Sequence, residues 1–61
     1  MFDVGDRVQI LKCIGIEKKL WLKFGTIIEV SESFYDYVVS VDGEDDMLYV
    51  EYNEIIKAKW W

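Results

Sequence analysis

The residues best suited to chemistry in this chain are those at 42–46, where four carboxylates fall within five positions as Asp42-Gly43-Glu44-Asp45-Asp46. A calcium loop needs about six to eight oxygens, with a glycine after three alternating ligands and a distant bidentate glutamate. Here the glycine comes second, and the segment has the composition of a tight hairpin. We therefore expect a solvated hairpin tip with a type I′ turn at Asp42-Gly43, with no metal and no cofactor. Weak divalent binding is the alternative.

The rest of the inventory excludes most kinds of catalysis. The chain has no histidine, so Ser–His and Cys–His activation are absent, and so is the commonest metal ligand. A single cysteine, Cys13, makes neither a zinc site nor an internal disulfide. The glycines are isolated rather than grouped into a phosphate-binding loop. We expect a non-enzymatic protein with no catalytic residue.

Location follows from the same composition. The first ten residues carry no signal-peptide pattern, and the lone cysteine suits a reducing compartment. No apolar run approaches the ~20 residues of a membrane span. We expect a cytoplasmic protein with no membrane association.

Charge is divided along the sequence. Up to residue 24 the chain carries five bases and three acids, whereas residues 25–56 carry nine acids and no base. A field of that sign speeds association with basic partners and repels phosphates. The prediction is a surface that binds a basic protein, formed by Asp36, Asp42, Glu44, Asp45, Asp46, Tyr49 and Glu51. The alternative is that acidity only keeps a small, aromatic-rich domain soluble.

A second candidate surface is the basic and aromatic segment at 17–23, with Lys18, Lys19, Trp21 and Lys23. In nucleic-acid binders, lysines hold phosphates while an aromatic ring stacks on a base, at about 1–3 kcal/mol per stack. Trp21 could instead be a lid over one end of the fold. At the far end of the chain, Trp60 and Trp61 are adjacent, which suggests self-association or partner docking through them, with packing against Phe2 as the alternative.

Five short runs rich in Val, Ile, Tyr and Phe must position these residues. They are predicted as strands at 7–14, 26–30, 34–41, 47–52 and 55–60, within one domain over 1–61. Alternation predicts a core of Val8, Ile10, Tyr37, Val39, Val41, Leu48, Val50 and Ile55. Ile27, Ile28 and Val30 break the alternation, which predicts a β-bulge that turns two of them inward. A small barrel is the most economical way to bury five such faces.

Several segments resemble SH3-like barrels. Residues 4–10 (VGDRVQI) are similar to their opening strand, 24–30 (FGTIIEV) to their second strand, and 37–50 to their distal hairpin. Residues 50–55 resemble the helical turn before the closing strand. The resemblance implies an all-β, five-stranded SH3-like barrel with a short helical turn before the last strand.

Subfamilies of that architecture suggest different functions. The proline of the late turn in peptide-binding SH3 domains is absent, which argues against proline-rich ligands. KOW barrels share the Gly-Asp-Arg-Val-like start, and Tudor-like barrels suggest an aromatic cage from Trp21, Tyr35 and Tyr37.

The sequence as a whole predicts a small acidic protein-binding module. It would dock as an inhibitor or adaptor on the basic surface of a nucleic-acid-binding protein, as phage and mobile-element inhibitors do. The alternative is a KOW-like nucleic-acid-binding barrel that uses the segment at 17–23.

Overall fold

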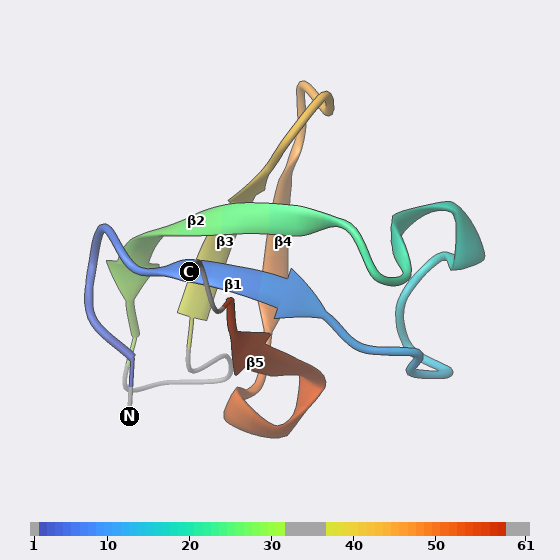
Figure 1. Cartoon of the computed structure of the whole chain (residues 1–61), viewed down its shortest axis with the longest axis horizontal. Helices are drawn as coiled ribbons and strands as arrows, with labels where there is room; N and C mark the ends of the chain where they lie inside the picture. Colours follow the sequence, from blue (N-terminus) through green and yellow to red (C-terminus); the bar gives the residue numbers. More distant parts are fainter. Residues whose placement is uncertain (1, 32–36, 59–61) are drawn as a thin grey trace.

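The computed structural model describes residues 2–31 and 37–58, and within them the chain is all-β. Five strands form one antiparallel sheet in the order β4-β3-β2-β1-β5 (Figure 1). The strands are β1 (Arg7–Ile10), β2 (Phe24–Val30), β3 (Tyr37–Val41), β4 (Met47–Val50) and β5 (Ile55–Lys57). Two single 3-10 turns, η1 (Lys18–Leu20) and η2 (Tyr52–Glu54), are the helical segments of the described chain. No ladder among the described residues joins the edge strands β4 and β5, so the sheet is open.

All five predicted strands are present, and η2 lies where a helical turn was predicted, but several boundaries were wrong. β1 ends at Ile10 rather than at residue 14, because the Leu11 amide leaves the sheet ladder and donates to the Glu54 carbonyl at 2.9 Å. β4 ends at Val50 because Glu51 begins the capping box of η2. β2 starts two residues early, at Phe24. β5 ends at Lys57, so Ala58 is not part of the strand as predicted. Residues 34–36 and 59–60 of the predicted strands lie outside the described residues.

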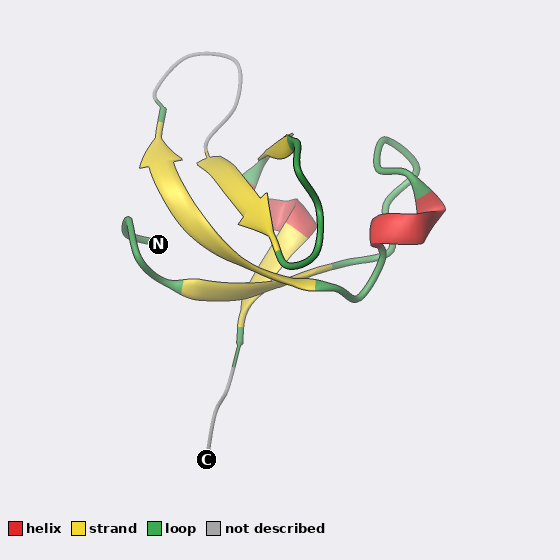
Figure 2. Cartoon of the chain, turned by 90° about the horizontal axis from the view of Figure 1, so that it is seen from above, coloured by secondary structure: helices red, strands yellow, loops and turns green. Residues whose placement is uncertain are grey.

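The sheet is bent about β2, which pairs with β1 over Phe24 to Thr26 and with β3 from Gly25 to Val30. In Figure 1 the β3–β4 hairpin runs across β1 and β2, and Figure 2 shows the curvature from above. The bend requires Gly25, since a Cβ there would lie 2.6 Å from Val39 Cγ1 and 2.7 Å from the Ser40 carbonyl oxygen. The register shifts between Ile27 and Glu29, which confirms the position of the predicted bulge.

The core lies on the concave side of this bent sheet. Of the eight predicted core residues, seven are buried and Leu48 is half-buried against them. The bulge turns only Ile27 inward, whereas Ile28 and Val30 are exposed, so the expected pair of inward residues was wrong. Ile16 and Leu20, from the loop between β1 and β2, complete the core.

No helix in the described part of the chain has the length and apolar character needed to cross a membrane.

Candidate functional site

The acidic hairpin tip is wider than the sequence suggested. The last ladder pair of β3 and β4 joins Ser40 to Met47, and the Glu44 amide donates to the Val41 carbonyl at 3.1 Å. Gly43 has a φ of 83°, but Asp42 keeps a negative φ, so the predicted type I′ turn was wrong. One positive φ at the third turn position is typical of a type II turn. Asp42 stays in line with its strand because its amide donates to the Phe24 carbonyl at 2.9 Å.

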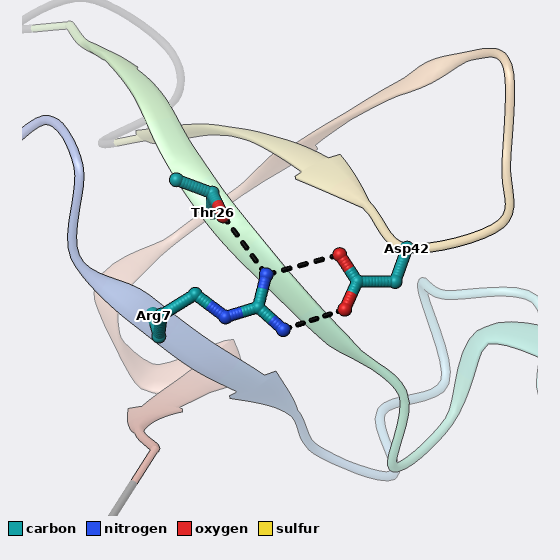
Figure 3. A network of polar contacts seen from close by, with 3 residues as sticks. All are labelled: Arg7, Thr26 and Asp42. Atoms are coloured by element: carbon teal, nitrogen blue, oxygen red, sulfur yellow. Dashed lines mark hydrogen bonds and ion pairs between the residues drawn. The ribbon is translucent and has the colours of Figure 1, made fainter. Parts of the chain in front are cut away.

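Asp42 belongs to a polar network on the convex face of the sheet (Figure 3). Arg7 donates to both carboxylate oxygens of Asp42, at 3.0 and 2.5 Å, and to the hydroxyl of Thr26 at 2.9 Å. The network links β1, β2 and the end of β3. The hydrogen bond from Arg7 lowers the pKa of the Asp42 carboxyl below its ordinary value, and the same contact raises the pKa of Arg7.

Glu44 joins the hairpin to the loop between β1 and β2 (the first loop). Its carboxylate accepts a hydrogen bond from Lys23 Nζ at 3.1 Å and lies 3.6 Å from Lys19 Nζ. The hydrogen bond from Lys23, followed by the positive charges of Lys23 and Lys19, lowers the pKa of Glu44. The two candidate surfaces, acidic hairpin and basic loop, therefore contact each other.

A positive φ of 65° at Leu22 turns the chain into Lys23. The Leu22 amide donates to the Ile10 carbonyl at 2.8 Å, and its carbonyl accepts from the Gln9 side chain at 3.1 Å. These contacts with β1 hold the unfavourable conformation in place.

The remaining predicted residues of the hairpin lie at the solvent. Asp45, Asp46 and Glu51 are exposed, and within the described residues neither Asp45 nor Asp46 makes an ion pair. Tyr49 is 55% exposed and Met47, two residues earlier on β4, is 57% exposed. Tyr49 pairs with Val38 of β3 in the ladder. Asp36 lies outside the described residues.

Trp21 stabilises the first loop through internal contacts and does not project from it into solvent. Its indole N–H donates to the carbonyls of Cys13 at 3.1 Å and Ile16 at 3.0 Å, and the half-buried ring packs against the core. Lys18 Nζ lies 6.0 Å from the ring centroid, within range of a cation–π contact. Lysines and tryptophan of the predicted basic surface thus make internal contacts.

An aromatic cage that includes Tyr37 does not form. Tyr37 is buried, its ring makes an edge contact with Phe2 at 5.2 Å, and its hydroxyl accepts from the Phe2 amide at 3.3 Å. Tyr35, Trp60 and Trp61 lie outside the described residues.

A shallow pocket of about 120 Å³ opens between η1 and the hairpin, and no sequence pattern had indicated it. Its apolar lining is Leu20, Val41, Met47 and Leu48. Its charged lining is Glu17, Lys19, Glu44 and Asp46. The pocket exists because the loop folds back onto the hairpin, a contact between segments that no local sequence pattern encodes.

The described residues contain no group of three or more cysteine, aspartate or glutamate side chains placed to hold a metal ion. No protein-family model matches the chain, and no curated protein or solved structure matches it.

Proposed function

We propose that this chain is an SH3-like barrel domain that acts as a non-enzymatic protein-binding module and docks on the basic surface of a partner protein. The antiparallel meander of β1 to β4, the return of β5 to pair with β1, the long loop between β1 and β2, and the η2 turn directly before β5 support that architecture.

The observation that carries the docking proposal is how the structure divides the hairpin acids. Asp42 and Glu44 are paired with bases of this chain, whereas Asp45, Asp46 and Glu51 are exposed around Met47 and Tyr49. We call these last five residues the hairpin surface. A tyrosine and a methionine flanked by charges have the composition of a protein interface. In such interfaces the apolar centre contributes most of the binding energy, and the charges at the rim speed association with the partner.

An acidic surface of this kind would compete with nucleic acid for the same basic face of the partner. The chain would then act as an inhibitor or an adaptor of a nucleic-acid-binding protein. The same proposal places it in the cytoplasm, where Cys13 stays a free thiol.

The test is affinity capture with the immobilised chain, followed by mass spectrometry and by measured binding of the purified partner. We expect a basic partner whose association slows in the Asp45→Asn, Asp46→Asn, Glu51→Gln variant, most visibly at low salt. Asp3→Asn, which removes an exposed carboxylate in the segment that precedes β1, is the control. Equal association rates for the triple variant and the wild type would contradict the proposal.

The alternative, a KOW-like nucleic-acid-binding barrel, has less support because Lys19, Trp21 and Lys23 make internal contacts. It makes a different prediction, since DNA or RNA would then bind with a strong salt dependence that Lys18→Ala weakens.

A further inference from the structure

We propose that the pocket between η1 and the hairpin receives one arginine side chain of the basic partner. This inference rests on the proposed function and adds to it a definite point of recognition. The pocket adjoins the hairpin surface directly, since Asp46 and Met47 belong to both.

The size of the pocket selects its occupant. Sites for cofactors and drug-sized ligands run from about 300 to 1,000 Å³, well above the 120 Å³ available here. That space suits a single long side chain. Half of the lining residues are apolar, namely Leu20, Val41, Met47 and Leu48, so the pocket favours a side chain with an aliphatic stem.

The charges around the pocket select a cation. Glu17 lines the pocket from the start of η1 and Asp46 lines it from the hairpin, so acidic residues of two segments contribute to its lining. Glu44 already holds two ammonium groups of this chain, at 3.1 Å for Lys23 and 3.6 Å for Lys19. The Lys19 side chain is 64% exposed and makes the longer contact, which makes it the one that an incoming cation displaces.

Arginine fits this arrangement better than lysine. Its planar guanidinium presents several N–H donors in a fixed fork that reaches two carboxylates at once, and it is more weakly hydrated than an ammonium. Its aliphatic stem covers apolar surface while the charged head stays at the rim.

The test uses unstructured Gly/Ser peptides that carry several arginines, several lysines, or several citrullines as the neutral counterpart of arginine. Binding is followed by amide chemical shifts of the labelled full chain. The arginine peptide is expected to bind most tightly and to shift the amides of Glu17, Leu20 and Leu48, and the citrulline peptide to leave them unmoved. Equal affinity for the lysine and arginine peptides would overturn the assignment to arginine.

Two variants confined to the pocket have opposite expected effects. Glu17→Gln weakens binding of the arginine peptide about two- to fivefold, the range expected for losing one exposed ionic contact. Lys19→Met keeps the side-chain stem but removes the competing ammonium, so it strengthens binding by a similar factor. Both changes are at exposed positions, and Asp3→Asn is the matched control.

The outcomes separate this inference from the proposed function. If Asp45→Asn and Glu51→Gln weaken the arginine peptide while Glu17→Gln and Lys19→Met do nothing, the hairpin surface docks without the pocket, and the inference is wrong. If no basic peptide binds, the inference fails, whereas the proposed function is decided by the captured partner and the triple hairpin variant. If Lys19→Met weakens binding, the pocket does not hold a cation.

Discussion

At the residue scale, the positions that matter most are those whose neighbours are distant in the sequence. The acidic hairpin could be predicted because its carboxylates are consecutive. The basic partners of these carboxylates could not be predicted, because they are distant in the sequence. Arg7 lies 35 residues from Asp42, and Lys23 lies 21 residues from Glu44. Only the fold decides which carboxylates stay available for a partner protein.

Gly25 illustrates the same point for packing. Its missing Cβ would meet both the Val39 side chain and the Ser40 carbonyl, and the backbone atom cannot move aside without breaking the β2–β3 ladder. Gly25→Ala should therefore cost about 1–3 kcal/mol, as overpacking does. Gly43→Ala meets no neighbouring atom but strains a positive φ, at about 1–2 kcal/mol. Urea denaturation of both variants checks these values, and a Gly25→Ala protein as stable as the wild type would exclude the close approach.

The Arg7–Asp42 pair predicts how stability depends on pH. The folded-state pKa of Asp42 lies below its ordinary value of 3.8, so the folded state favours the ionised carboxyl. This contribution is fully present above pH 3.8 and is lost as the pH falls through the lower, folded-state pKa. Asp42→Asn should lower the thermal midpoint at neutral pH, and the gap from wild type should close in strong acid. A gap that stayed constant with pH would show that the ion pair does not contribute.

At the scale of elements, the presence of each strand was easier to predict than the residues at which it begins and ends. Strands alternate in polarity over few residues, so all five could be predicted from local sequence. Their ends depend on distant partners, as where the Leu11 amide turns away from β1 toward the Glu54 carbonyl. The segment at 17–23 was predicted as a binding surface, yet its Leu20 enters the core together with Ile16, which lies just before that segment.

The assignment of strand faces is tested by truncation in β3 and β4. Val39 and Val50 are fully buried, so Val39→Ala and Val50→Ala should each cost about 1–3 kcal/mol through lost methyl groups and residual cavities. Met47→Ala, on the exposed face of β4, should change stability by less than about 0.5 kcal/mol. Chemical denaturation checks all three. Comparable losses at Met47 and Val39 would mean that the faces are reversed.

At the scale of the whole molecule, the two charged regions of the sequence meet in space instead of facing opposite ways. Lys19 and Lys23 of the first loop lie against Glu44, and Arg7 lies against Asp42, so two of the nine carboxylates in residues 25–56 have basic partners within the chain. The three acids of the hairpin surface, Asp45, Asp46 and Glu51, are exposed and make no ion pair within the described residues. Folding thereby reduces a broad acidic region to a smaller one with apolar side chains at its centre.

This division predicts opposite effects on stability for acids that are neighbours in the sequence. Asp45→Asn with Asp46→Asn should leave the thermal midpoint equal or higher, because adjacent like charges at one tip repel each other. Glu44→Gln should lower it, because the folded state loses the contacts to Lys23 and Lys19. Both shifts should shrink as salt is added, since the charges are near the solvent. A Glu44→Gln variant with a raised midpoint, as expected for the Asp45→Asn, Asp46→Asn variant, would contradict this prediction. The contacts of Glu44 with Lys19 and Lys23 would then not hold the first loop against the hairpin, and the pocket between them would not be formed as described.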